Sequence, residues 1–313
     1  MAQVQNGTGA VAEELSVHGT VVREGRDSDI VGGVAPRFVA TPPDTAAVSA
    51  LMAAAARHGL ACVVRGNGTK IGWGAPPQRC DLVVDTTALT GIDHAAGDLV
   101  VQCGAGTGLA DLQEALAGAN QRLSADTVVP DSTVGGAVAT GLSGPRRILH
   151  GPMRDLIIGM TTVRADGVAA ASGGRVVKNV AGYDLGKLHT GALGTLGVIT
   201  SVTFRLHPLP PAQRVVTSTV DGLATAHARA MEVLRSPLVP AALELDWPHD
   251  GPLTLQVLLE GAEGGIEARA SELSDLLGGG RVATEPTPGW ERLPGAPGDT
   301  IVRLAVPLTE VAD

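Results

Sequence analysis

The sequence predicts an α+β protein of two domains. Helix and strand patterns alternate over the first part of the chain, strands dominate from about residue 157, and an order β-α-β-β-α-β follows residue 211. At 313 residues the chain is long enough for one large or two ordinary domains, each with a buried core. We expect domains at 35–210 and 211–313, preceded by a loosely ordered segment at 1–34.

The first elements of residues 35–210 predict a small parallel sheet. Asp44 can cap an Ala-rich helix that ends at Gly59, because an aspartate oxygen accepts a first-turn N–H and glycine favours the stop. Three apolar runs are expected as strands and are followed by a helix, at 61–65, 81–85, 99–103 and 109–116. Strand, crossover and strand in this order predict parallel pairing.

Small residues and then strands make up the rest of the first domain. Residues 128–144 are almost all small and cannot form a core alone, so something else must fill the space beside them. Strands are expected at 157–164, 167–172 and 198–206, with a short helix at 183–189. The sequence His-Pro-Leu-Pro-Pro at 207–211 interrupts regular structure and marks the domain boundary.

Beyond this boundary the pattern changes to that of a ferredoxin-like domain. The order β-α-β-β-α-β is characteristic of that arrangement. Its elements are expected at 215–220, 223–234, 241–246, 253–259, 264–277 and 281–284. A proline-rich loop, 286–297, precedes a last strand expected at 300–306.

Composition excludes several classes of function. Charged residues are 18% of the chain and the net charge is -9, so no nucleic-acid partner is expected. No apolar run approaches the roughly 20 residues of a membrane span, and no signal-peptide pattern opens the chain. We expect a cytoplasmic protein, with attachment to the inner face of the membrane as the alternative. The three cysteines and the scattered histidines have no metal-site spacing, so no metal is expected and the thiols are interpreted as buried and inert.

Glycine is the unusual component, with 42 residues, nearly twice the usual share of about 7%. The segment R-G-N-G-T-K at 65–70 follows a predicted strand, where successive N–H groups can form an anion-binding nest. The segment P-D-S-T-V-G-G-A-V-A-T-G at 130–141 places Thr133 before paired glycines that could lie along a flat ligand. A surface turn and a tight helix-to-strand corner are the respective structural alternatives.

A third glycine-rich segment, G-A-G-T-G at 104–108, lies between a strand and a helix as a dinucleotide fingerprint would. The third fingerprint glycine would fall at Leu109, and no clear acidic residue ends a second strand about 20 residues later. An ordinary tight turn is therefore the better interpretation.

Together the segments at 65–70 and 130–141 resemble the vanillyl-alcohol oxidase / p-cresol methylhydroxylase (PCMH) family of FAD-binding proteins. Further motifs follow in the family's order: G-P-R-R at 144–147, R-D at 154–155, K-N-V-A-G-Y-D-L at 178–185 and G-A-L-G-T-L-G-V-I-T at 191–200. The chain is most similar to the smaller flavin subunits of bacterial glycolate oxidases, strongly over about 35–210 and weakly beyond. The resemblance implies a PCMH-type two-subdomain FAD-binding domain followed by a shortened ferredoxin-like cap.

The resemblance also implies where FAD binds. Residues 66–70 would hold the pyrophosphate through backbone N–H groups, the segment from Thr133 would continue toward the ribityl chain, and the backbone at Ile199 would meet the adenine. Because Thr69 stands where covalent members often carry histidine, noncovalent FAD is expected. The implied cofactor-binding residues are Arg65, Gly66, Asn67, Gly68, Thr69, Lys70, Pro130, Asp131, Thr133, Val134, Gly135, Gly136, Ala139, Gly141, Ser143 and Ile199. Tyr183 and Asp184 would lie near the flavin, or else be a core tyrosine and a helix cap.

The function implied is that of an FAD-dependent oxidoreductase. It would oxidise a 2-hydroxy acid to a 2-oxo acid, or relay the electrons, in a glycolate oxidase-like complex with a second flavin subunit and an iron–sulfur subunit. Related dehydrogenases carry an arginine and catalytic histidines in the cap, which relatives usually continue further than this chain. His227 and His249 are isolated here and are interpreted as surface residues, so the catalytic residues stay unassigned. A structural or electron-relay subunit is the alternative, and a stand-alone oxidase would need a complete pocket that the sequence does not show.

Overall fold

The computed structural model describes residues 2–175, 183–287, 289–295, 299–302, 304 and 306–307, with side chains from residue 9 onward. The chain divides into two compact units. The first unit comprises Met1–Leu123, Val129–Leu142 and Met153–Pro208, and the second comprises Ser124–Val128, Ser143–Pro152 and Leu209–Asp313. Two short stretches of the predicted first domain therefore group with the second unit. No helix in the described part of the chain is long and apolar enough to cross a bilayer.

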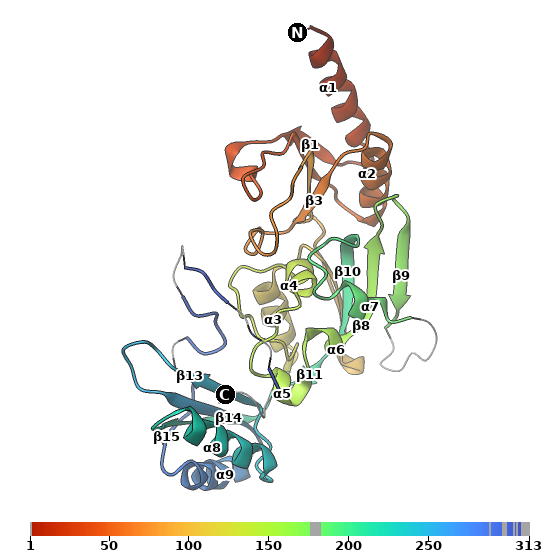
Figure 1. Cartoon of the computed structure of the whole chain (residues 1–313). Coiled ribbons are helices and arrows are strands. Elements are labelled where there is room, and N and C mark those ends of the chain that lie inside the picture. Colours follow the sequence, from red (N-terminus) through yellow and green to blue (C-terminus); the bar gives the residue numbers. More distant parts are fainter. Residues whose placement is uncertain are drawn as a thin grey trace. The chain divides into compact units, whose positions relative to one another are not determined.

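The first unit begins with a four-stranded sheet, of which β1 and β3 are labelled in Figure 1. Its strand order is β1-β2-β4-β3. Its strands are β1 (Val21–Glu24), β2 (Phe38–Thr41), β3 (Cys62–Arg65) and β4 (Leu82–Asp85). β2 and β3 both run parallel to β4, which confirms the predicted parallel pairing of the segments at 61–65 and 81–85. Helix α2 (Thr45–Arg57) starts as predicted, with Asp44 Oδ1 accepting from the Ala47 N–H at 2.8 Å, and ends before Gly59, whose φ is +58°.

The expectation of a loosely ordered segment at 1–34 is wrong where the structure describes it. Helix α1 (Ala2–Leu15) is followed by β1, which pairs antiparallel with β2, and by a 3-10 turn, η1 (Asp27–Asp29). Asp29 and Val31 are both buried, with 2% and 3% of their surface exposed. The weak sequence pattern has a physical cause, since β1 is an edge strand and the buried group at residue 29 is an ion-paired carboxylate.

A second sheet of the first unit is antiparallel throughout, in the order β5-β6-β10-β8-β9. Its strands are β5 (Ile92–Ala95), β6 (Val100–Gly104), β8 (Ile157–Val163), β9 (Ala169–Gly173) and β10 (Val198–Arg205). The predicted strand at 99–103 thus exists as β6, but it belongs to this sheet and not to the parallel one. Its partner β5 was missed because the sequence Ile-Asp-His-Ala has no apolar run.

Helices cover and connect these two sheets. α2 lies between them, because its buried face packs in one cluster with Leu82 and Val84 of β4, Val163 of β8 and Val198 of β10. The other elements of the first unit are η2 (Ala96–Asp98), α3 (Leu109–Ala117), β7 (Gln121–Arg122), α4 (Val134–Thr140), α6 (Met153–Leu156), α7 (Leu185–His189) and β11 (His207–Pro208). β11 pairs with β7, so the first two residues of the predicted 207–211 break continue as a strand.

The glycine-rich segment at 104–108 is a tight strand-to-helix turn, as expected. A Cβ at Gly104 would overlap the carbonyl oxygen of Leu89, and one at Gly106 would overlap that of Thr86. These glycines are therefore required by backbone packing inside the unit.

The second unit contains the predicted ferredoxin-like arrangement. Its elements are α5 (Arg147–His150), β12 (Ala212–Thr219), α8 (Leu223–Arg235), β13 (Ala242–Asp246), β14 (Thr254–Gly261), α9 (Glu263–Leu276) and β15 (Arg281–Ala283). The antiparallel sheet has the order β13-β14-β12-β15. Val216 faces the core shared with α8 and α9, whereas neighbouring Val215 packs with Trp290 on the opposite face. The described residues within 300–306 form no strand, so the expected last strand is not found there.

Candidate cofactor site

A cavity of about 440 Å³ lies in the first unit, where β3 ends. Segments far apart in the sequence form its wall, including the loop after β3, the start of α4 with Thr133, and residues 193–195. The side-chain amide of Asn67 donates a hydrogen bond to the carbonyl oxygen of Asp131 at 2.8 Å. The structure therefore brings the two predicted glycine-rich segments together at one cavity.

Gly66 is the point of closest approach between the two segments. A Cβ at this position would overlap the hydroxyl oxygen of Thr133, so a larger residue would push the segments apart. Gly68 has a φ of +74°, a conformation that glycine adopts at little cost and other residues rarely adopt. The loop conformation thus depends on glycine at both positions.

The backbone amides differ between the two segments. Within the described part of the chain, the N–H groups from Gly66 to Lys70 donate no hydrogen bond. Those of Val134, Gly135 and Gly136 are paired with the Thr107 oxygen, the Ala105 oxygen and Thr133 Oγ1, respectively. Unpaired N–H groups in a glycine-containing loop beside a cavity suit an anion such as a diphosphate. The loop after β3 can therefore bind a diphosphate, while α4 supports it.

Lys70 supplies a positive charge to this cavity. Its side chain is buried, and Nζ donates to Thr69 Oγ1 at 3.0 Å and to Ser132 Oγ at 2.6 Å. The Ser132 hydroxyl donates in turn to the Val129 oxygen at 2.7 Å, so two of the three ammonium protons have acceptors. Among the described residues, no carboxylate lies within ion-pair distance of Nζ. Burial lowers the pKa of Lys70 to about 8.

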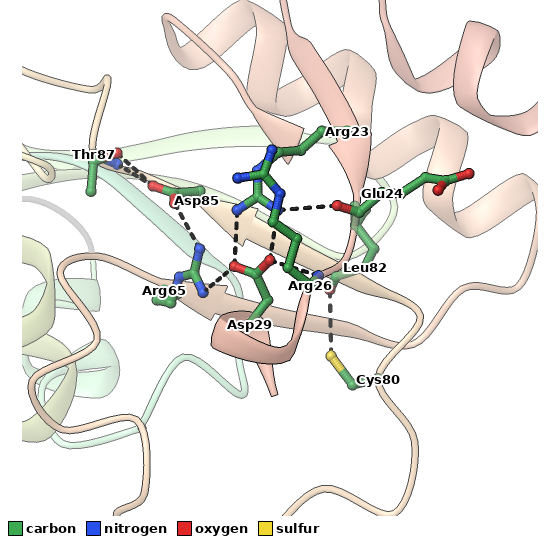
Figure 2. Close-up of polar contacts among 9 residues, drawn as sticks. All are labelled: Arg23, Glu24, Arg26, Asp29, Arg65, Cys80, Leu82, Asp85 and Thr87. Carbon is green, nitrogen blue, oxygen red and sulfur yellow. Dashed lines mark hydrogen bonds and ion pairs between the residues drawn. The ribbon is translucent and has the colours of Figure 1, made fainter. Parts of the chain in front are cut away.

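Arg65, the other cation of the cavity wall, is held by carboxylates. Figure 2 shows its guanidinium between two acidic side chains, with Nη1 at 2.9 Å from Asp29 Oδ1 and Nη2 at 3.0 Å from Asp85 Oδ2. Its charge is therefore balanced locally, in contrast to that of Lys70.

The predicted residues fall into two groups. Nine line the cavity: Arg65, Gly66, Asn67, Gly68, Thr69, Lys70, Thr133, Gly136 and Ala139. The other seven, which do not line it, are Pro130, Asp131, Val134, Gly135, Gly141, Ser143 and Ile199. Pro130 is exposed, and Asp131 touches the loop through its carbonyl. Val134 and Gly135 are buried behind the loop, where a Cβ at Gly135 would press on Ala105.

Three more of the predicted residues are not part of the cavity wall. Gly141 ends α4 with a φ of +61° against Gly191. Ile199 is buried within β10, and Ser143 belongs to the second unit. Their contacts with FAD stay predictions. In the motif at 178–185, Asp184 caps α7 through the Lys187 N–H, Tyr183 is 92% exposed and so is not a core tyrosine, and residues 178–182 lie outside the described chain.

The cavity also has an apolar wall that the sequence did not assign. It includes Val31, Ile71, Trp73, Pro77 and Leu193. Leu193 lies in the motif at 191–200, and Trp73 lies in the loop that follows Lys70. These two residues therefore belong to, or closely follow, motifs that the sequence analysis identified. Val31 comes from the segment expected to be loosely ordered, and no local pattern marks it.

Cys80 and Cys103 are buried, as expected, whereas Cys62 is half-buried. Burial raises the pKa of Cys62, which lines the cavity, to about 11 and that of Cys103 to about 12. No group of three or more His, Cys, Asp or Glu side chains arranged for a metal exists among the described residues.

The second unit holds the arginine of the G-P-R-R motif in a cluster of carboxylates. Arg146 bonds Asp126 at 2.9 Å, lies 3.5 Å from Glu260 and also pairs with Glu291. His249 is exposed, as predicted, whereas His227 is half-buried and lines a separate, largely apolar cavity. The carboxylate cluster around Arg146 contains no group of histidines, within the part of the unit that the structure describes.

Comparison with known proteins adds the family context. Residues 36–171 match the family described as FAD binding domain. Glycolate oxidase subunit GlcE of Escherichia coli is 33% identical over 74% of this chain and 63% of its own length. D-lactate dehydrogenase of Archaeoglobus fulgidus is 33% identical over 67% of this chain and 48% of its own. The chain thus spans about half to two thirds of the length of these relatives.

Solved structures share the fold. An alkyldihydroxyacetonephosphate synthase matches with a TM-score of 0.67 at 19% identity, over 80% of this chain and 56% of that one. Physcomitrella patens BBE-like 1 matches with a TM-score of 0.64 at 19% identity, over 85% of this chain and 59% of that one. At these identities the likeness is one of fold.

Proposed function

We propose that this chain, whose residues 36–171 match the family described as FAD binding domain, is the PCMH-type FAD-binding subunit of an oxidoreductase acting on a 2-hydroxy acid. The observation that carries the proposal is the cavity beside β3, which is lined both by the loop with unpaired amides and by Lys70. These groups complement a diphosphate, the most highly charged part of FAD.

The residues of the cavity have distinct tasks in this proposal. The N–H groups of 66–70 and Nζ of Lys70 bind the diphosphate, Gly66 lets the loop approach Thr133, and Gly136 leaves room at the cavity wall. The apolar wall with Trp73 and Leu193 excludes water from one side. When bound, FAD supplies the acceptor for a hydride from an alcohol carbon, and the protein supplies binding and orientation.

The substrate class and the assembly rest on the relatives. Those compared above are named as a glycolate oxidase subunit and a D-lactate dehydrogenase. We infer a small 2-hydroxy acid as the substrate of the assembly, and a second flavin subunit and an iron–sulfur subunit as partners. These inferences concern whole proteins of which this chain spans only part.

An electron-relay role is the second candidate. It is favoured by the second unit, where His249 is exposed and Arg146 is neutralised by carboxylates within the described residues. A substrate carboxylate needs an unneutralised cation, and hydride abstraction needs a positioned base. In this case substrate chemistry resides on the partner flavin subunit.

The protein is expected to purify yellow and to release intact FAD into the supernatant after acid or heat. Thr69 holds the loop position at which a covalent link would require histidine, and burial keeps the nearby Cys62 thiol protonated. Absorbance of the supernatant and the pellet measures the partition. Colour that remains with the precipitated chain would show a covalent bond.

Anaerobic addition of glycolate or D-lactate tests the substrate proposal. The isolated chain is expected to bleach slowly or not at all, and bleaching is expected to become rapid with the partner flavin and iron–sulfur subunits present. Rapid turnover by the isolated chain, followed with a dye acceptor, would exclude the relay role. A protein that cannot be loaded with FAD under any condition would contradict the proposed function itself.

A further inference from the structure

Arg65 connects the cofactor loop to the N-terminal segment through a chain of alternating charges. Asp29 accepts from Arg23 at 2.6 and 2.9 Å, and from Arg65 at 2.9 Å. Arg65 reaches Asp85 on its other side. Figure 2 shows these four side chains in sequence, from Arg23 to Asp85. Two positive and two negative charges make the quartet neutral overall.

Asp29 is the central member of this quartet. Its side chain is 3% exposed, and a third donor, the backbone N–H of Arg26, lies 3.0 Å from Oδ2. The Arg23 guanidinium, together with that of Arg65, holds the pKa of Asp29 well below its usual range. A buried carboxylate in this environment stays ionised and keeps its partners in place.

The position of Arg65 is transmitted directly to the loop. The Arg65 backbone oxygen accepts from the Thr86 N–H at 2.8 Å, which fixes the end of β3 against β4. Its side-chain stem lies under Gly68, because a Cβ on that glycine would be 3.6 Å from Arg65 Cδ. The guanidinium itself donates to two carboxylates, and Asp85 is held in turn by the backbone and hydroxyl of Thr87.

The same N-terminal segment contacts the far end of the loop. Val31 packs in one cluster with Val63 and Ile71 and lines the cavity. A Cβ on Gly32 would be 2.6 Å from Cβ of Pro76, so the segment lies close against that part of the loop. Residues 29–32 therefore touch the loop before and after the stretch with unpaired amides.

We propose that Arg23 and residues 29–32 are part of the cofactor site and that Asp29 is its positioning residue, holding Arg65 so that the loop 66–70 keeps its diphosphate-binding conformation. In this arrangement Arg65 acts through packing and is not a phosphate ligand. Lys70 then supplies the unbalanced charge. The inference rests on the proposed function, since it concerns the same FAD site.

An electrostatic role and a positioning role of Asp29 predict opposite effects of Asp29→Asn on FAD binding. Removing a negative charge near the cavity would strengthen binding of a diphosphate if only the electrostatic field mattered. Loss of the Asp29–Arg65 pair would instead leave a buried guanidinium underbonded and the loop free to shift. We expect FAD to bind roughly tenfold or more weakly, as for loss of a charge-assisted hydrogen bond.

Arg65→Lys provides a second variant that leaves the net charge unchanged. A lysine cannot fork between Asp29 and Asp85, because its ammonium is a single point of charge. A positioning role therefore predicts weaker FAD binding by Arg65→Lys, whereas a purely electrostatic effect predicts an unchanged dissociation constant. Asp27→Asn is the matched control, since it removes the same charge two residues from Asp29 at an exposed site without a contact to Arg65.

The experiment measures the FAD dissociation constant of the purified full chain by flavin fluorescence, and the melting temperature of each variant without FAD. Weaker binding by Asp29→Asn and Arg65→Lys, with Asp27→Asn like the wild type, supports the proposal. If Asp29→Asn does not fold, Arg65→Lys decides. Unchanged or tighter binding in either folded variant overturns the positioning role. Absence of FAD binding by the wild type would instead contradict the proposed function.

Discussion

Gly136→Asp is expected to leave the protein folded but unable to retain FAD. Gly136 lines the cavity, and a Cβ there would lie 3.1 Å from Thr133 Oγ1 and 4.0 Å from Nζ of Lys70. The new carboxylate can therefore pair with the ammonium, which would neutralise it and place a negative charge where the diphosphate binds. Like charges in a partly desolvated site are costly. The ratio of flavin to protein absorbance after purification should fall close to zero.

Two further variants separate charge from bulk at this position. Gly136→Ala adds only the methyl group and should weaken FAD binding less than aspartate does. Gly97→Asp adds the same charge to the same unit at a glycine with no atom within 4 Å of the added Cβ, and should bind FAD like the wild type. A yellow Gly136→Asp protein with the wild-type dissociation constant would show that the diphosphate lies elsewhere.

Lys70→Met is expected to weaken FAD binding by roughly tenfold to a hundredfold, the range for loss of a charge-assisted hydrogen bond. Methionine keeps much of the buried stem but removes the charge that faces the cavity. Titration with FAD measures the change. Lys187→Met is the control, because Lys187 is exposed and pairs with Asp184 away from the cavity.

The pH dependence of FAD binding gives a second, independent signature of Lys70. Burial lowers the pKa of Lys70 to about 8 in the free protein, and a bound diphosphate would raise it, since the anion favours the charged form. The free protein must then take up a proton to bind FAD above pH 8. Affinity should fall as pH rises beyond 8, by up to about tenfold per pH unit.

Stability of the free protein should show the opposite trend. The folded free protein binds fewer protons at Lys70 than the unfolded chain between about pH 8 and the ordinary lysine pKa of 10.5, so its stability rises with pH through that window. Lys70→Met should flatten both profiles. If the affinity of the wild type for FAD is constant from pH 7 to 9.5, as is expected of Lys70→Met, then Lys70 does not bind the diphosphate.

Local sequence was sufficient for most elements because their signals are short-range. Asp44 and Gly59 predicted both ends of α2, and the alternation beyond residue 211 predicted every strand and helix of the ferredoxin-like arrangement. The additional strand expected at 300–306 was wrong for the residues that the structure describes there. The segment at 65–70 could be proposed as an anion-binding loop, with a surface turn as the alternative, because glycines that follow a strand are visible in the local sequence. Caps, periodicity and glycine conformations are properties of a few adjacent residues, so a sequence displays them directly.

Contacts between distant residues were decided only in the folded chain. The strand β6 could not be assigned to its antiparallel sheet, because that depends on pairing with β10, about a hundred residues later. Asp29 carries no local sign that it is buried against Arg65, and Val31 none that it lines the cavity. Sequence patterns specify which residues can be buried or charged. Their partners, and with them the balance of charge between Arg65 and Lys70, follow from packing, because burial and ion pairing depend on groups that only tertiary structure brings together.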